Sequence, residues 1–445
     1  MSGPGQFRVD LGRCIGCETC VLACRMERRE TAPLRRVLSF NALRLPQLPV
    51  FHLSLACHHC RQPVCMTHCP AGAYRRDPAT GAVLLDPGRC MGCRYCTWAC
   101  PHDAPRFVPE RGTAVKCDFC QERQAQGLEP ACVAHCPVRA LGFEPLQEAA
   151  GDPLPPGFPS TRTGPAVRFV MGLRPPPALT APPDPGLLAR CREALVRVAE
   201  PGLRARDEWA LVAFTATLPV LVALVATAAA RAGRLVPVPL PFPWLMLWAG
   251  ALCLSLSAWH LGHPERAWRA LRNLRHSWLS REVALVLAFL GLTALGLIGF
   301  PGVRGLVWAA AAAGFAALFA VDRVYQVAVR TSRLDFHSAH ALFNGLYLTG
   351  LLAGYWPLAL AAGALKAWLY LGRKAHFQRQ GRGVRPMLSL VRIALGFILP
   401  ALVFGSGGAV LGAVLGDLVD RWEYYGELVF PSPQRQMARD LRALS

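Results

Sequence analysis

The stretch Cys90–Pro101, CMGCRYCTWACP, decides the fold of the first third of this chain. Three cysteines follow one another at every third position, and a fourth comes after three further residues and stands before a proline. In this spacing the first three cysteines wrap three corners of an iron–sulfur cubane, while the fourth lies too far round and ligates a partner cluster. The stretch therefore predicts a bacterial-ferredoxin-like domain that holds iron–sulfur clusters in pairs.

Three more groups of four cysteines accompany this one. In chain order the groups are Cys14, Cys17, Cys20 and Cys24; Cys57, Cys60, Cys65 and Cys69; Cys90, Cys93, Cys96 and Cys100; and Cys117, Cys120, Cys132 and Cys136. Zinc knuckles also use C-x2-C pairs, but the repeated C-x3-C-P endings are more specific and favour iron–sulfur. Sixteen cysteines at four per cluster predict four 4Fe-4S clusters. The remaining two, Cys191 and Cys253, are interpreted as small buried or interfacial residues.

The composition indicates a membrane protein. Of the 445 residues, 53% are hydrophobic and only 17% are charged, which is unusual for a soluble chain. The net charge of +20 is compatible with nucleic-acid binding, although in a membrane protein the commoner cause is arginine retained on the cytoplasmic side. The first ten residues, MSGPGQFRVD, hold neither an apolar segment nor twin arginines. We therefore expect no export signal, and metal ligation rather than disulfides.

Hydropathy and composition divide the chain into four parts. Residues 1–145 form the cysteine-rich domain, 146–206 a Pro/Gly-rich linker with a short amphipathic segment at about 187–204, 207–426 a membrane anchor, and 427–445 a tail. About 20 apolar residues cross the hydrocarbon core of a bilayer. Eight apolar runs are predicted as transmembrane helices: 209–230, 243–262, 283–300, 304–322, 339–356, 357–372, 388–405 and 406–422. The predicted fold class is α+β, a double ferredoxin-like domain followed by an all-α polytopic membrane domain.

An arginine-rich stretch, WHLGHPERAWRALRNLRHSWLSRE (259–282), separates the second apolar run from the third. Arginines recur at every third position and alternate with an apolar stripe. The arginines are Arg266, Arg269, Arg272 and Arg275, and the stripe is Trp268, Leu271, Leu274 and Trp278. This pattern predicts an interfacial amphipathic helix whose arginines face lipid headgroups and water.

The cysteine layout resembles the four-cluster ferredoxin subunits of the dimethyl sulfoxide reductase family of molybdenum enzymes. In that family the first and fourth cysteine groups exchange ligands, as do the second and third. The resemblance implies one cluster on Cys14, Cys17, Cys20 and Cys136, its partner on Cys24, Cys117, Cys120 and Cys132, a third on Cys57, Cys60, Cys65 and Cys100, and a fourth on Cys69, Cys90, Cys93 and Cys96. It covers residues 5–145 and implies an electron-transfer role, with four cubanes because every ligand is cysteine.

The second half resembles the membrane anchor subunit of the same enzymes, so the chain looks like a fusion of two subunits. The match runs through DEWALVAFT (207–215), AWHLGHPERAWRALRNLRHSWLSRE (258–282), DRVYQ (322–326) and GDLVDRWEYYG (416–426). The family's anchor binds quinol without haem, and the resemblance assigns the quinone site to His260 and Glu282. A histidine that titrates near neutrality can handle a proton of the quinol, and a glutamate at the mouth of a helix can relay protons to water.

Other polar residues of the anchor are weaker candidates. Charges at the predicted span ends are interpreted first as anchors or ion pairs and only second as quinone-site residues: these are Asp322, Arg323, Asp417, Asp420 and Arg421. A bis-histidine haem needs histidines that face each other from different spans. His337 and His340 are expected at the start of one helix and His376 in a loop, so no haem is expected.

The resemblance also implies partners and a location. The expected partners are a separate molybdopterin-containing catalytic chain, the lipid bilayer and the quinone pool (menaquinone or ubiquinone), and no nucleic acid. With eight spans, 17 Lys and Arg residues fall in the loops and tail on the side of the cysteine-rich domain, against three on the other side. By the positive-inside rule that domain faces the cytoplasm, at the cytoplasmic membrane. The best-known reductases of the family face the opposite way, so the equivalent subunit of a cytoplasm-facing sulfite dehydrogenase, which reduces quinone, stays as an alternative.

Two further hypotheses come from other classes of protein. In one, the clusters carry electrons but the membrane part is purely structural and never contacts quinone. In the other, the chain is a nucleic-acid-binding zinc protein, which the net charge of +20 suggests.

Overall fold

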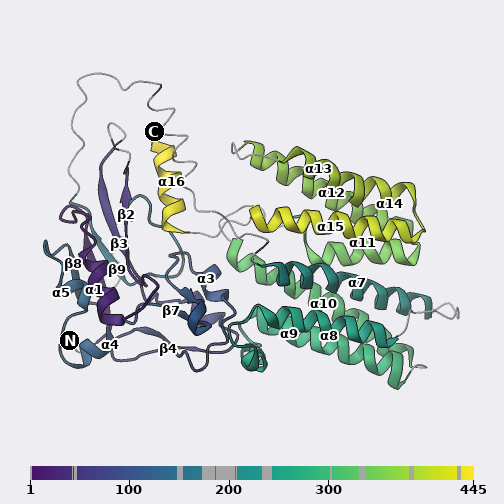
Figure 1. Cartoon of the computed structure of the whole chain (residues 1–445), viewed down its shortest axis with the longest axis horizontal. Coiled ribbons are helices and arrows are strands. Elements are labelled where there is room, and N and C mark those ends of the chain that lie inside the picture. Colours follow the sequence, from purple (N-terminus) through teal and green to yellow (C-terminus); the bar gives the residue numbers. More distant parts are fainter. Residues whose placement is uncertain are drawn as a thin grey trace. The chain divides into compact units, whose positions relative to one another are not determined.

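The structure is a computed structural model of the chain, and it describes residues 3–42, 44, 48–147, 154–172, 186, 206, 208–232, 243–300, 303–329, 337–379, 385–427 and 432–444. They belong to two compact units (Figure 1), Met1–Pro201 together with Phe430–Ser445, and Gly202–Val429. We call the first the cysteine-rich unit and the second the helical unit. The amphipathic segment predicted at about 187–204 lies outside the described residues.

The cysteine-rich unit is built on a three-stranded sheet. Its central strand, β1 (Gly5–Asp10), pairs antiparallel with β8 (Leu141–Pro145) and parallel with β9 (Val167–Val170). Phe7 and Val9 of β1 point to the same face and are buried in the core. Three two-stranded antiparallel ribbons complete the strands: β2 (Arg36–Phe40) with β3 (Phe51–Leu55), β4 (Tyr74–Arg76) with β5 (Val83–Leu85), and β6 (Arg106–Val108) with β7 (Thr113–Val115).

Short helices follow the cysteine loops of this unit. They are α1 (Thr19–Arg28), α2 (Val64–Thr67), α3 (Tyr95–Ala99), α4 (Gln121–Ala125) and α5 (Ala131–Ala134), with a 3₁₀ turn, η1 (Pro109–Arg111). The residue before α1, α3 and α4 adopts a left-handed conformation, at Glu18, Arg94 and Cys120 respectively. The chain therefore turns sharply out of each of these cysteine loops before it becomes helical.

The C-terminal helix, α16 (Pro433–Leu444), belongs to the cysteine-rich unit. Met437 of this helix joins the hydrophobic core of the unit, and Asp440 accepts a hydrogen bond of 2.6 Å from the backbone N–H of Gly157. A Cβ at Gly157, where φ is +84°, would lie 2.2 Å from Met437 Cγ, so this turn requires glycine. The unit thus extends beyond the predicted residues 1–145, because it takes β9 from the predicted linker and α16 from the predicted tail.

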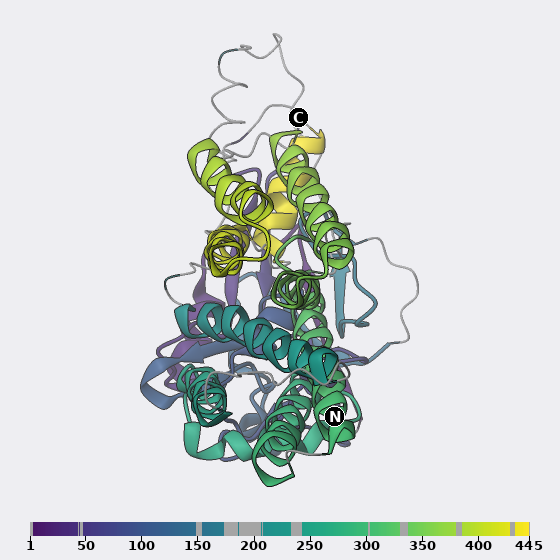
Figure 2. The same ribbon diagram turned by 90° about the vertical axis from the view of Figure 1, so that its right-hand side faces the viewer.

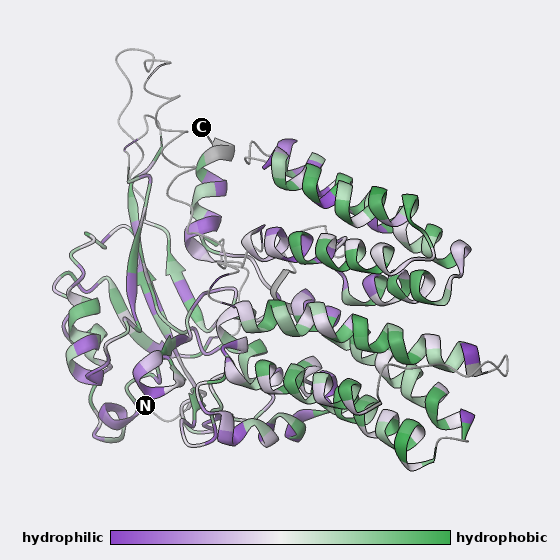
Figure 3. Cartoon of the chain, turned by 45° about the vertical axis from the view of Figure 1, so that its right-hand side comes forward, coloured by the Kyte–Doolittle hydropathy of each residue, from purple (hydrophilic) through white to green (hydrophobic). Residues whose placement is uncertain are grey.

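The helical unit consists, in its described part, of helices whose axes run side by side (Figures 1 and 2). In chain order they are α7 (Trp209–Ala232), α8 (Pro243–Trp259), α9 (Trp278–Ala294), α10 (Arg304–Val329), α11 (Ala341–Ala353), α12 (Trp356–Arg379), α13 (Pro386–Ile393), α14 (Leu399–Leu402) and α15 (Gly407–Glu427). Single π-helical turns extend α9 at η3 (Leu295–Gly299) and join α13 to α14 at η4 (Ala394–Ile398). Hydrophobic residues dominate α7 to α10 (Figure 3), as expected for helices in a bilayer.

The arginine-rich stretch forms a 3₁₀ helix, η2 (Pro264–Asn273), which is bent by 95° from α8. The predicted apolar stripe is exposed at Trp268, Leu271 and Leu274. The guanidinium of Arg272 lies over the Trp268 ring, 4.7 Å from its centroid. An exposed apolar stripe on a helix that turns away from a span suits the surface of a membrane.

Three helices of the described part are long and apolar enough to cross a membrane: Trp209–Arg231, Trp278–Gly299 and Arg304–Gln326. The bent pair of α8 and η2 would make a fourth. α11 has 13 residues and is therefore only about 20 Å long, and α12 and α15 carry buried charges. The prediction of eight transmembrane helices is not confirmed, whereas the coarser prediction of an α+β cysteine-rich domain followed by an all-helical domain is.

Candidate iron–sulfur centres and quinone site

Two of the predicted cysteine sets surround separate hollows in the cysteine-rich unit. Cys14, Cys17, Cys20 and Cys136 line the first. Cys57, Cys60, Cys65 and Cys100 line the second. In each hollow the last thiol comes from a different cysteine group of the sequence, so the fold itself crosses the groups over.

The other two predicted sets also come together. Electrostatic interactions connect Cys24, Cys117, Cys120 and Cys132 with one another, and likewise Cys69, Cys90, Cys93 and Cys96. None of the sixteen cysteines forms a disulfide. The thiols of each implied set lie near one another, and interactions also cross between sets, as between Cys117 and Cys57.

A left-handed turn recurs in every C-x2-C loop that begins a group. The third residue of each loop has a positive φ: +72° at Gly16, +42° at His59, +74° at Gly92 and +63° at Phe119. The turn brings backbone N–H groups to the thiols, because the amide nitrogen of His59 lies 3.5 Å from Cys57 Sγ and that of Phe119 lies 3.4 Å from Cys117 Sγ. Such turns form anion-binding concavities at many iron–sulfur sites. The residues present therefore fit a cubane.

A single metal ion fits these thiols less well. Zinc needs four ligand atoms that converge to within about 2.3 Å of one point. Among the described residues, no three His, Cys, Asp or Glu side chains lie close enough together to hold one ion. Burial raises the pKa of Cys60 to about 11 and that of Cys100 to about 12. Bonding to metal stabilises the thiolate form that such buried groups otherwise avoid.

Three buried polar residues lie among the thiols, and no spacing pattern in the sequence singles them out. They are Arg35, Lys116 and Tyr74, and each interacts with cysteines of two different sets. Arginine and lysine are rarely buried unless paired. Cysteines that ligate metal do so as thiolates, and in that form the cysteines around Arg35 and Lys116 would provide the negative charge that buried cations need.

His260 and Glu282 lie where α8 ends and α9 begins. His260 is the first residue after α8 and is half-buried, and Glu282 lies in the second turn of α9 and is 5% exposed. Glu282 interacts electrostatically with Cys253 of α8 and with Asp322 of α10. Cys253 precedes His260 by seven residues, or two helical turns, so the face of α8 that meets Glu282 continues toward His260.

Asp322 connects α10 to the start of α11. Its carboxylate accepts hydrogen bonds from the backbone N–H groups of Ala341 (2.7 Å) and Leu342 (3.0 Å), and it pairs with Nδ1 of His340 at 3.0 Å. The rings of His340 and His337 stack, with centroids 4.3 Å apart. Both histidines precede the same helix, as the sequence predicted, whereas His376, which was expected in a loop, lies in the last turn of α12.

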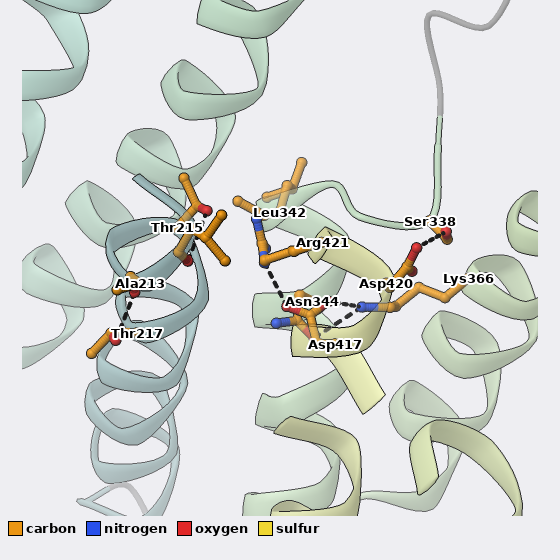
Figure 4. Close-up of polar contacts among 12 residues, drawn as sticks. Ala213, Thr215, Thr217, Ser338, Leu342, Asn344, Lys366, Asp417, Asp420 and Arg421 are labelled. Atoms are coloured by element: carbon orange, nitrogen blue, oxygen red, sulfur yellow. Dashed lines mark hydrogen bonds and ion pairs between the residues drawn. The ribbon is translucent and has the colours of Figure 1, made fainter. Parts of the chain in front are cut away.

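A buried ionic network connects α11, α12 and α15 (Figure 4). Lys366 of α12 is 1% exposed, and its ammonium lies 3.0 Å from Oδ1 of Asp417 and 2.9 Å from Oδ1 of Asn344. Arg421 pairs with the same aspartate at 2.6 Å. Asp417 and Arg421 were interpreted as charges at a span end, but the structure places them in the interior, where they pair with each other.

Asp420 holds the second half of this network. Its carboxylate lies 2.7 Å from Nη2 of Arg373 and 3.3 Å from Nη2 of Arg392, and it accepts a hydrogen bond of 3.0 Å from Ser338. Arg323, the remaining predicted span-end charge, lies over the Trp278 ring. Asp417, Asp420 and Arg421 were singled out from the sequence, but their partners Lys366, Arg373 and Arg392 were not.

Two family models match successive parts of the chain. A 4Fe-4S dicluster domain matches residues 48–145, and the DMSO reductase anchor subunit (DmsC) matches residues 209–367. The probable anaerobic dimethyl sulfoxide reductase chain YnfG of Escherichia coli (strain K12) is 40% identical over 154 residues, which cover 32% of this chain and 74% of the relative. This chain thus belongs to the dimethyl sulfoxide reductase family.

Further relatives agree with this family. An anaerobic dimethyl sulfoxide reductase chain of Escherichia coli (strain K12) is 39% identical over 154 residues, with 32% of this chain and 74% of the relative covered. A sulfite dehydrogenase subunit of Allochromatium vinosum is 32% identical over 158 residues, with 30% of this chain and 66% of the relative covered. The predicted fusion is confirmed: one polypeptide of the dimethyl sulfoxide reductase family combines an iron–sulfur electron-transfer subunit with a membrane anchor subunit.

Proposed function

We propose that this chain passes electrons between the membrane quinone pool and a separate molybdopterin-containing catalytic chain through four 4Fe-4S clusters. The proposed ligand sets are those implied by the resemblance, which we name by their first members: the Cys14, Cys24, Cys57 and Cys69 sets. Each cubane accepts and releases one electron at a time. The observation that carries the proposal is the meeting of thiols from different cysteine groups around separate hollows.

The chain's own residues hold and insulate the clusters. The left-handed turns direct amide N–H groups to Cys57 and Cys117, and such hydrogen bonds to sulfur stabilise the more negative, reduced state. Aromatic side chains pack beside the cysteine loops, since Phe119 is buried and its ring packs against Phe7 at 5.1 Å. Low exposure to solvent and fixed hydrogen bonds are the means by which a protein tunes cluster potentials.

The proposal assigns the quinone site to His260 and Glu282. Quinol oxidation releases two electrons and two protons, and in this scheme His260 accepts a proton while Glu282 relays protons to water. Two observations support the assignment. Glu282 is buried beside Asp322 although it lies near the start of its helix, and His260 is followed directly by the bent, exposed η2 helix. Buried ionisable residues in membrane helices are by default functional candidates.

A cytoplasm-facing complex of the sulfite dehydrogenase type is the second candidate. In such a complex a catalytic chain oxidises sulfite, and the electrons pass through the clusters to quinone. This candidate is supported by the similarity to the sulfite dehydrogenase subunit of Allochromatium vinosum and by the topology predicted from the sequence, which with eight spans puts 17 Lys and Arg residues on the side of the cysteine-rich domain and three on the other. A periplasmic reporter fused near Arg379 is expected to be inactive, and an active reporter would overturn the cytoplasmic orientation.

The main experiment uses the full chain purified together with its catalytic partner. Four cubanes predict about 16 iron atoms and 16 acid-labile sulfides per chain, and zinc in their place would overturn the proposal. His260→Gln is expected to abolish reduction of the clusters by quinol while leaving reduction by dithionite intact. The matched control is His276→Gln, which changes an exposed histidine of the same arginine-rich stretch. Unchanged quinol-coupled turnover in an assembled His260→Gln complex would refute the assignment of the quinone site.

A further inference from the structure

Arg35 lies between the Cys14 set and the Cys24 set. Its side chain is 1% exposed, and Nη1 donates a hydrogen bond of 3.0 Å to Ser54 Oγ, which itself lies 3.3 Å from Cys20 Sγ. The guanidinium interacts electrostatically with Cys20 of the first set and with three cysteines of the second. Its Nε and Nη2 have no hydrogen-bond partner among the described residues, so these donors are available to the sulfurs beside them.

Lys116 lies between the Cys24 set and the Cys57 set. Its side chain is 6% exposed, and the ammonium donates hydrogen bonds to the backbone carbonyls of Val83 and Cys117, the latter at 2.7 Å. It interacts electrostatically with Cys57 and Cys65 on one side and with Cys117 on the other. The ammonium is therefore held by backbone carbonyls between thiols of two different sets.

Tyr74 lies between the Cys57 set and the Cys69 set. The side chain is buried. Its hydroxyl interacts as a hydrogen-bond partner with Cys96 of the Cys69 set, and it also interacts with Cys65 of the Cys57 set. A buried hydroxyl needs a hydrogen-bond partner, and cysteine sulfur provides one here.

We propose that Arg35, Lys116 and Tyr74 occupy the three successive junctions of the cluster path and set the potentials of the clusters on either side. This inference rests on the proposed ligand sets, and it orders the clusters along the path as the Cys14, Cys24, Cys57 and Cys69 sets. Reduction makes a cluster more negative, so a buried cation favours the reduced form and raises the potential. In a protein interior the effect falls off with distance, so each residue acts mainly on its two neighbours.

The three junction residues differ in the charge that they place beside the clusters. Arg35 and Lys116 carry a full charge in a buried position, whereas Tyr74 offers only a hydroxyl dipole. The cluster of the Cys24 set has a junction cation on each side, and the cluster of the Cys69 set adjoins only Tyr74 of the three junction residues. The inference therefore assigns the largest stabilisation of the reduced state to the Cys24 cluster.

The test is a redox titration of the full chain with its partner, in which paramagnetic resonance follows each cluster. Arg35→Gln is expected to lower the potentials of the Cys14 and Cys24 clusters by a tenfold change in the ratio of reduced to oxidised forms, about 59 mV for one electron, and to leave the other two unchanged. Lys116→Gln should act in the same way on the Cys24 and Cys57 clusters. Tyr74→Phe should produce a smaller shift in the Cys57 and Cys69 clusters.

The control variant is Arg168→Gln, which removes the same charge from the same unit. Arg168 pairs with Glu144 at 2.8 Å on the sheet, and no potential is expected to change. Equal shifts of all four clusters in Arg35→Gln, or no shift with all signals intact, would overturn the inference. If Arg35→Gln does not assemble, Arg35→Lys must keep the wild-type potentials, and Tyr74→Phe still tests the third junction.

Failure of the inference and failure of the proposed function are distinguishable. A wild-type chain without iron, or with fewer than four clusters, contradicts the proposed function. If four clusters are present but their potentials do not change when the neighbouring junction residue is substituted, only the inference is contradicted.

Discussion

Replacement of Asp420 by asparagine tests whether the buried ionic network holds the helical unit together. Asp420 is 0% exposed and is the only carboxylate, among the described residues, that pairs with Arg392. Arg373 has a second carboxylate partner in Glu427, at 3.1 Å. The substitution Asp420→Asn keeps the size of the side chain and removes its charge, and it leaves chiefly Arg392 buried without a counter-charge.

The structure sets the size of the expected effect. Removal of one partner of a buried ion pair costs about 3–5 kcal/mol, because the remaining charge stays desolvated. Ser338→Ala removes only a hydrogen-bond donor to the same carboxylate, which is worth about 1.5–3 kcal/mol. The double substitution Asp420→Asn with Arg392→Met removes both charges, and such replacements are often close to neutral. We therefore expect the double variant to be more stable than Asp420→Asn alone.

The assay is unfolding of the purified full chain in mixed micelles, followed by tryptophan fluorescence. The expected order of stability is wild type, then Ser338→Ala, then Asp420→Asn, with the double variant above Asp420→Asn. A loss below about 1 kcal/mol for Asp420→Asn, which is the range of exposed ion pairs, would refute the idea that this network is desolvated. A double variant less stable than Asp420→Asn would show that Arg392 contributes through packing rather than charge.

Three further predictions concern close packing and the clusters. Gly157→Val should release α16 from the cysteine-rich unit at a cost of about 1–3 kcal/mol, because its Cβ meets Met437; limited proteolysis measures this, and Gly127→Val, at a similar φ of +74° with open space around it, is the control. Gly416→Val should separate α15 from η4, since a Cβ there lies 2.4 Å from the Cα of Gly396; wild-type thermal stability would contradict this. Oxidative removal of iron with a chelator should abolish cooperative melting of the cysteine-rich unit, because Arg35 then loses its counter-charges; an unchanged calorimetric transition would disprove that reason.

The cysteine sets could be read from the sequence because ligand chemistry is local and the resemblance supplies the exchange between groups. Spacing such as that of Cys90, Cys93 and Cys96 is a direct consequence of the shape of a cubane. The crossing of groups is not local, and spacing alone does not reveal that Cys136 meets Cys14. The family resemblance predicted that the groups exchange ligands, and in the structure Cys136 lines the same hollow as Cys14.

Arg35 and Lys116 could not have been found in this way. Arg35 is one of two adjacent arginines and Lys116 an isolated lysine, and the surroundings of each depend on neighbours that tertiary folding brings to it. The same is true of α16, because an amphipathic segment after the last helix looks like a tail until its partner surface is known. Local patterns report local chemistry, whereas compensation of a buried charge is a property of the whole fold.

Hydropathy also failed to predict how the later helices are stabilised. The run 357–372 was expected to be a simple apolar span, yet it contains Lys366, which is paired at the centre of the network. An average over about 20 residues hides one lysine, although a single charge dominates the energetics of a helix in hydrocarbon. The single charged residue of this run, Lys366, therefore says more about how the helix is stabilised than the average hydropathy does.

The net charge of +20 takes on a different meaning once the cysteines are considered. That figure counts Lys, Arg, Asp and Glu but no thiol, and cysteines ligate metal as thiolates. The charges of Arg35 and Lys116 are compensated by groups that this figure leaves out, since the groups that raise their pKa are cysteines rather than carboxylates. The arginines of η2 have a separate cause, because they share a helix with an exposed apolar stripe suited to a membrane surface. The proposed sulfur ligation thus explains the burial of Arg35 and Lys116, a membrane surface suits the arginines of η2, and the net charge of +20 does not by itself predict binding to nucleic acid.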